Sequence, residues 1–339
     1  MKPKKKLTLS GVLKYILPLV LIAVAVVVIY PNFRTEWPKI PEVLRASDKT
    51  LLIWLILLQS LIYLFDGSLS YTLLSILEVR VKWRHAVRIA ILSAISGKIL
   101  PVVGNALTAF FFYGKLKVRL REVLFVIFSW NFLYIVNFLA FFGLALIFAP
   151  SSFHAVVHPT GFWGIVIVFA TAIIAAVVLL VNRGRNLIRL TKFLSRVTKR
   201  DLNAEGIVKS LHEFYEDLRL LRSKKALTLR ALGLSALYYL DNVVVLYFSF
   251  IVFHYHPNFL VVALGFNFST ILALITLVPE VPGVTEASMA LVFVAFGYPV
   301  HIAVLTSILY RFVSYWILLP LGAHSYYKLK QAYGERKRN

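Results

Sequence analysis

The sequence lacks cysteine altogether, and it lacks lysine and arginine over one long stretch. No cysteine occurs among its 339 residues, and no lysine or arginine occurs from Ala231 to Tyr310. The first absence excludes a disulfide framework, a thiol nucleophile and cysteine-ligated zinc. The second absence is informative because the chain as a whole carries a net charge of +22. A basic protein that keeps cations out of a long apolar stretch is typical of membrane-embedded chains.

Acidic residues are also scarce, since 15 Asp and Glu stand against 37 Lys and Arg, while 60% of the residues are hydrophobic. The basic residues flank the apolar runs, as orientation signals do, so we expect membrane phospholipids and no nucleic acid as partners. A spanning helix needs about 20 apolar residues, and the runs of that length predict six spans, at about 11–30, 50–78, 123–149, 162–181, 231–253 and 300–327. The sequence therefore predicts an all-α polytopic membrane protein with a single integral membrane domain over residues 1–339.

The distribution of cations predicts how these spans are oriented. Lysines gather at the N-terminus, and the loop 182–230 is rich in lysine and arginine. Cytoplasmic loops carry such an excess, so we expect both termini and this loop on the cytoplasmic side of a prokaryotic plasma membrane. The loop can lie on the anionic inner leaflet or dock a cytoplasmic protein partner, and a homo-oligomer is compatible with the sequence.

One apolar tract, Ile89 to Tyr113, has basic residues on both flanks, in 80–88 and 115–121. An ordinary span would place one of these basic clusters outside, against the positive-inside rule. Near its midpoint the tract carries residues that interrupt a helix or add polarity to it, namely Lys98, Pro101, Gly104 and Asn105. A re-entrant hairpin that enters and leaves the membrane on the cytoplasmic side accounts for both features.

A second broken tract, at about 259–296, contains Pro279, Glu280, Pro282, Gly283 and Glu286. Proline removes a backbone donor and clashes with the preceding turn, and such breaks are tolerated at membrane depth where protein or a wet cavity surrounds them. We expect this tract to form a second re-entrant hairpin, which enters from the outside. A first repeat at about 50–149 and a second repeat at about 231–327 then have inverted topology, as in many transporters.

Carboxylates at membrane depth cost a few kcal/mol and are functional by default. Glu280 and Glu286 are the main candidates. Glu286 can serve as an N-terminal cap of the returning half-helix, where the helix dipole favours an acid, or as a ligand for a cationic headgroup or a proton. Asp66 and Asp241 lie midway along predicted spans, and each either faces the cavity or reaches an interface through helix tilt.

Arg311 is the only lysine or arginine in the last predicted span. From the middle of that span it cannot easily reach an interface, so we expect it to pair with Glu280, Glu286 or Asp241, or with a lipid phosphate. Lys98 holds the analogous place in the first hairpin, although its long side chain can instead extend to the cytoplasmic interface.

The sequence contains no motif for a metal, a nucleotide or a catalytic carboxylate pair. We therefore expect no metal, no cofactor and no enzymatic activity. Tryptophans, including Trp83 and Trp130, are expected at the membrane interfaces. The predicted substrate-binding residues come from the broken tracts and from the polar groups at depth: Lys98, Pro101, Gly104, Asn105, Asp241, Pro279, Glu280, Pro282, Gly283, Glu286 and Arg311.

The two broken tracts resemble the membrane region of lysylphosphatidylglycerol synthases, which also occurs as a free-standing membrane protein. The resemblance rests on the segments 100–105 (LPVVGN) and 279–286 (PEVPGVTE), with Gly297 after the second, and it covers most of the chain from about Leu51 onward. The family pattern has an acid where this chain has Asn105, with an arginine soon after it. The family also has a glycine-rich turn where this chain has a single glycine.

The resemblance implies a function in lipid transport. In bifunctional members of that family, the membrane region is associated with moving an aminoacylated phospholipid between leaflets, and a separate soluble domain performs the aminoacylation. No such domain follows the last predicted span, so we expect that activity to be absent. The leading hypothesis is an ATP-independent, flippase-like translocase for a polar lipid or a lipid-linked headgroup. The alternatives are an integral-membrane enzyme or accessory subunit in polar-lipid or lipid-linked glycan synthesis, and a small-solute or ion transporter.

Overall fold

The computed structural model of the protein describes residues 37–99, 108, 110–148, 221, 223–275, 284–316 and 318–335. Within these residues, every regular element is a helix. Four of the described helices are long and apolar enough to cross a membrane, namely Lys49–Ile76, Arg121–Ile147, Lys225–Ile251 and Val300–Gln331, the last of which includes undescribed positions. The prediction of an all-α membrane protein is confirmed.

The elements in chain order are η1 (Trp37–Lys39), α2 (Ile40–Ala46), α3 (Lys49–Ile76), α4 (Trp83–Ile99), η2 (Phe110–Lys115), α6 (Leu120–Ile147), α11 (Lys225–Ile251), α12 (Phe259–Ile275), α13 (Val284–Ala295), α14 (Val300–Trp316) and α15 (Leu318–Glu335). Polar side chains cap two of these helices. Asp48 accepts a hydrogen bond from the backbone N–H of Thr50 at 2.8 Å, at the start of α3. Asn258 accepts one from the N–H of Leu260 at 2.9 Å, at the start of α12. Such caps satisfy donors that the first helical turn leaves free, so the sequence itself fixes where α3 and α12 begin.

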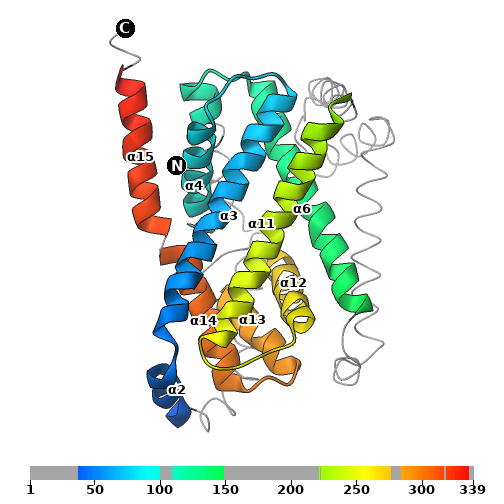
Figure 1. The fold of residues 1–339 in the computed structure, drawn as a ribbon, viewed down its shortest axis with the longest axis vertical. Coiled ribbons are helices and arrows are strands. Elements are labelled where there is room, and N and C mark those ends of the chain that lie inside the picture. Colours follow the sequence, from blue (N-terminus) through cyan, green and yellow to red (C-terminus); the bar gives the residue numbers. More distant parts are fainter. Residues whose placement is uncertain are drawn as a thin grey trace, which may run out of the picture.

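The fold combines long helices with helices of about half their length (Figure 1). The helices α3, α6 and α11 run through most of the height of the molecule, and α3 packs along α11. In the upper half of the view, α4 packs against α3, whereas α12 and α13 pack against each other in the lower half. The helix α14 contacts α13 and α11, and α15 contacts α4. The two broken tracts therefore occupy opposite halves of the molecule.

The first broken tract returns to the end of the molecule at which it begins. Ala86, in the first turns of α4, and Phe112, beyond the break, are buried in one apolar cluster. The hydroxyl of Thr108 donates a hydrogen bond to that of Ser93 in α4 at 2.7 Å. The two arms of the tract thus lie side by side, and residues 100–107 between them lie outside the described residues.

The second broken tract also returns to the end at which it begins. Tyr255 precedes α12 and Tyr298 follows α13, and their rings lie 5.5 Å apart. Between the two helices, Gly265 of α12 lies so close to Phe293 of α13 that a Cβ atom at Gly265 would overlap the ring. The described parts of both tracts therefore have the fold-back geometry of a hairpin. Whether the hairpins are re-entrant in a membrane stays a prediction.

The charged residues of the described loops and helix ends differ between the two ends of the molecule. The end at which α4 begins and α15 finishes, called the basic end below, carries Arg80, Lys82, Lys115, Lys117, Arg119, Lys224 and Lys330. The Nζ atom of Lys224 lies 2.7 Å from Oε1 of Glu78, and this contact holds the pKa of the Glu78 carboxyl below its ordinary value. The opposite end mixes Lys39, Arg45 and Lys49 with Glu42 and Asp48. This asymmetry is the pattern from which the orientation was predicted.

The last predicted span, 300–327, corresponds to α14 and α15, and residue 317 between them lies outside the described residues. The spans predicted at 11–30 and 162–181, and most of the loop 182–230, lie outside the described residues.

The packing of α4 on α3 generates a prediction about Gly67 of α3. A Cβ atom built at Gly67 would collide with the backbone of Val87 in α4. Overpacking of this kind costs about 1–3 kcal/mol, so Gly67→Ala should lower the midpoint of thermal unfolding in detergent. Gly233 of α11 has no described atom within 4 Å of its ideal Cβ position. Gly233→Ala is therefore the matched control and should raise stability by about 0.5–1 kcal/mol. Equal midpoints for the two variants would contradict the close approach of α3 and α4.

Candidate functional site

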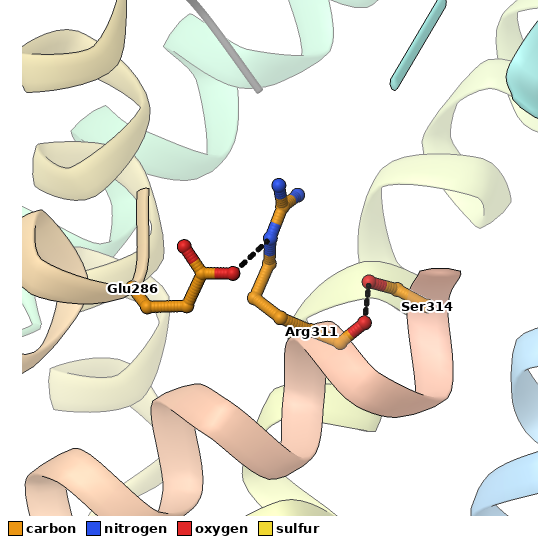
Figure 2. A network of polar contacts seen from close by, with 3 residues as sticks. All are labelled: Glu286, Arg311 and Ser314. Atoms are coloured by element: carbon orange, nitrogen blue, oxygen red, sulfur yellow. Dashed lines mark hydrogen bonds and ion pairs between the residues drawn. The ribbon is translucent and has the colours of Figure 1, made fainter. Parts of the chain in front are cut away.

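A buried ion pair joins α13 to α14. The Nε atom of Arg311 donates to Oε1 of Glu286 at 3.3 Å, and the two side chains are 6% and 23% exposed. Figure 2 shows the two side chains pointing toward each other from their helices. Of the three carboxylates predicted as partners for Arg311, the structure pairs it with Glu286. Their role in binding a substrate stays a prediction.

Local sequence places each partner. Glu286 lies in the first turn of α13, where the positive end of the helix dipole stabilises a carboxylate. Arg311 lies in the second half of α14 and is buried, so its guanidinium has no short route to either end of the helix. Glu286 therefore combines the two roles expected for it: the helix dipole favours its charge, and it pairs with a cation.

The helix that carries Arg311 is bonded to two other helices. The hydroxyl of Tyr310 donates to Oδ1 of Asn242 in α11 at 3.2 Å. The hydroxyl of Tyr63 in α3 donates to the backbone carbonyl of Ser314 at 3.4 Å. Ser314 itself donates to the carbonyl of Arg311 at 3.2 Å (Figure 2). The ion pair is therefore held where α3, α11, α13 and α14 converge.

Asp241 lies on α11, one residue before the Asn242 that bonds to α14. Asp241 is 7% exposed, and its buried Oδ2 atom has no hydrogen-bond partner among the described residues. Four further buried oxygens lack a hydrogen-bond partner within the described chain, and three of them lie on the converging helices α3, α13 and α14: Oε1 of Gln59, Oγ1 of Thr285 and Oγ1 of Thr306. The fourth is Oγ of Ser129 in α6. Each unsatisfied polar group in an apolar interior costs about 1–3 kcal/mol. These oxygens give the converging helices a polar character.

The other predicted site residues are placed only in part. Lys98 lies near the end of α4, and its role stays a prediction. The remaining candidates fall outside the described residues, namely Pro101, Gly104, Asn105, Pro279, Glu280, Pro282 and Gly283. In the described part of the chain, no group of three His, Asp or Glu side chains is arranged to hold a metal ion. The prediction that no metal or cofactor is needed is not tested by this observation.

One polar contact was not expected from the sequence. The indole N–H of Trp130 in α6 donates to Oδ1 of Asp66 in α3 at 2.8 Å. Trp130 lies ten residues inside α6, which begins at Leu120. Its expected place at a membrane interface stays a prediction. The sequence did offer a signal for this contact. Trp130 lies far from both ends of an apolar helix, and another span contains a single acid that could accept its N–H.

Comparison with known proteins identifies relatives of the chain. The profile of the family described as "Lysylphosphatidylglycerol synthase TM region" matches residues 15–322. The match begins well before Leu51, where the resemblance was expected to start. The UPF0104 membrane protein MJ1595 of Methanocaldococcus jannaschii is 24% identical over 171 residues, which is 49% of this chain and 50% of that protein. The chain thus spans about half the length of this curated relative in their alignment.

The buried ion pair yields a prediction about stability. Removing one partner of such a pair leaves an uncompensated charge and costs about 3–5 kcal/mol, so Arg311→Gln should lower the unfolding midpoint strongly. Adding Glu286→Gln should restore much of the stability, because the orphaned carboxylate is then neutral. Adding Glu280→Gln instead should restore little, and Lys330→Gln on the exposed face of α15 should have little effect alone. Equal rescue by both second substitutions would contradict the specific pairing of Arg311 with Glu286.

Proposed function

The chain belongs to the lysylphosphatidylglycerol synthase TM region family, and we propose that it is an ATP-independent, flippase-like translocase. Its substrate is a polar lipid or a lipid-linked headgroup, which it moves across the cytoplasmic membrane. The observation that carries the proposal is the ion pair between Arg311 and Glu286, which is buried inside an apolar helical bundle. Ionisable groups at membrane depth are expensive and mark substrate paths.

The chemistry of this pair suits a phospholipid headgroup. The guanidinium of Arg311 presents several N–H donors in a fork that matches the oxygens of a phosphate. Its Nε bond to Glu286 is 3.3 Å long, which is longer than the 2.7–2.9 Å of a strong charge-assisted bond. A lipid phosphate can therefore compete for Arg311, and Glu286 then becomes available to a cationic group of the same lipid or to a proton.

The two fold-back tracts supply the architecture for transport. They occupy opposite halves of the molecule (Figure 1), as the re-entrant hairpins of an inverted-topology repeat do. In this proposal the first repeat is about 50–149 and the second about 231–327. The headgroup site lies between the repeats, near the bilayer midplane. Exposing the site alternately to the two sides then requires one repeat to move against the other.

The proposed orientation can be tested with single introduced cysteines, because the chain has none of its own. Val81→Cys and Lys117→Cys flank the first broken tract at the basic end. Both should react with a membrane-impermeant maleimide only when the cytoplasmic side is open to the reagent. His256→Cys, between α11 and α12, is the matched control and should react from the outside. External labelling at position 81 or 117 would rule out a first hairpin that opens toward the cytoplasm.

Reconstitution tests the proposed activity directly. The purified protein should accelerate leaflet exchange of acyl-labelled fluorescent phospholipids in vesicles without ATP, and the lipid mass should not change. The double variant Arg311→Gln, Glu286→Gln should fold yet lose exchange by about tenfold or more, since a factor of ten corresponds to about 1.4 kcal/mol of lost interaction. Lys330→Gln should exchange lipids as the wild type does. An altered lipid mass would indicate an enzyme instead, and exchange at the rate of empty vesicles would refute translocation of the lipids tried.

A further inference from the structure

Asp241 is a buried acid to which the proposed binding of a phosphate gives no task. The residue is 7% exposed, and its Oδ2 atom has no hydrogen-bond partner among the described residues. The acids of two neighbouring helices do have partners, since Glu286 bonds to Arg311 and Asp66 accepts the indole N–H of Trp130. Asp241 therefore differs from both, because the described chain leaves its buried oxygen unbonded.

The bond between α11 and α14 places Asp241 at the level of the ion pair. Asp241 lies ten residues before Ile251, the end of α11. Ten residues of α-helix rise about 15 Å, which is half of the hydrocarbon core of about 30 Å. The next residue, Asn242, accepts a hydrogen bond from Tyr310, which precedes Arg311. Asp241 and Arg311 are thus each one residue away from the same bond, in the middle of the bundle.

The helices around α11 offer Asp241 no spare counter-ion at this depth. α11 packs against α3, α6, α12 and α14. The charged groups Lys49, Arg121, Glu122 and His301 lie in first turns of these helices, and α12 has no ionisable residue. Towards the middle of the four helices and of α11 itself, the other ionisable groups are Tyr63, Asp66, Tyr134, Tyr238, Tyr239, Tyr310 and Arg311. Arg311 is the only cation in this last set, and Glu286 already engages it.

A carboxyl group in such surroundings is stable when it carries a proton. An ionised carboxylate that is buried without a partner costs far more free energy than the neutral acid, so the group takes up a proton instead. Water reverses this preference, because it solvates the carboxylate. The charge of Asp241 therefore depends on whether the helices around it are closed or open to water.

We infer that Asp241 binds and releases a proton in each transport cycle, so that a proton gradient drives the movement of the lipid. This inference rests on the proposed lipid translocation and adds the coupling ion to it. In the closed bundle Asp241 holds the proton in an O–H bond. When the bundle opens to one side, that bond breaks and the proton passes to water. The carboxylate then has to regain a proton before the helices can close over it again.

Infrared spectroscopy tests the proton site without any transport. The carbonyl stretch of a protonated carboxylic acid is separate from the bands of carboxylates. The purified protein should show this acid band at neutral pH, and Asp241→Asn should lose it, because the amide keeps the shape of the side chain but carries no acid. Asp48→Asn is the matched control and should keep the band, since Asp48 caps α3 at the end of the bundle.

Transport in vesicles tests the coupling. The vesicles consist of phosphatidylethanolamine and phosphatidylglycerol and contain acyl-labelled fluorescent phosphatidylglycerol. A gradient of one pH unit should change the ratio of inward to outward movement about tenfold if one proton moves with each lipid, which corresponds to about 1.4 kcal/mol. Asp241→Asn should lose this response to the gradient, and Lys330→Gln should keep it.

The outcomes separate the proton site from the proposed function. An acid band that persists in Asp241→Asn, or that disappears in Asp66→Asn, would overturn the proton site. Lipid exchange that ignores the gradient would overturn the coupling and leave the translocase standing. An acid band that depends on Asp241, in a protein that exchanges no lipid, would keep the proton site while translocation and its coupling both fail.

A second measurement decides if Asp241→Asn does not fold. Asp66→Asn leaves Asp241 as the only aspartate in the described spanning helices. In this variant, a heavy carbon isotope at the aspartate carboxyls should shift the acid band. An unshifted band would show that the proton is held by another group and would overturn the inference.

Discussion

Polar side chains inside an apolar helical bundle have to find their partners in the protein, because lipid offers none. In the described part of this structure several of those partners lie on other helices, and α11 takes part in three of these cross-helix bonds. The cross-helix pairs on α11 are Ser235 with Asn137 of α6, Tyr239 with Asn267 of α12, and Asn242 with Tyr310 of α14. Hydrogen bonds of this kind contribute about 0.6–2 kcal/mol each. Three of them, on three neighbours, fix the rotation and the register of α11, and the bond to Tyr310 also ties α11 to the part of α14 that carries Arg311.

The two ends of the bundle are held together by contacts of different kinds. At the basic end, Lys224 bonds to Glu78, whose side chain is 81% exposed, and exposed ion pairs contribute little. The helices at that end are held mainly by a buried apolar cluster that includes Ala86 and Phe112. At the opposite end the backbone N–H of Asp48 bonds to the carbonyl of Val252 at 3.0 Å, and Phe250 contacts Phe293 in a cluster of rings.

The sequence predicts the long helices well and the interior contacts poorly, for physical reasons. The starts of α3 and α12 follow from caps and hydropathy alone, and the pairing of Arg311 could be narrowed to a few carboxylates because charges at depth are so few. The bond between Trp130 and Asp66 could not be predicted, because it depends on how α3 and α6 are rotated.

An ion pair, rather than a lone charge, is what a carrier of charged headgroups needs at the midplane. A lone Arg311 would stabilise a bound phosphate but would leave an expensive charge whenever the site is empty. Pairing with Glu286 lowers the cost of the empty state, and in the proposed transport cycle the dipole of α13 would stabilise the carboxylate once a lipid phosphate binds Arg311. Asp66 meets the same problem differently, with an indole N–H in place of a cation. The bundle thus stabilises these two acids in two ways, by an ion pair between α13 and α14 and by a hydrogen bond between α3 and α6.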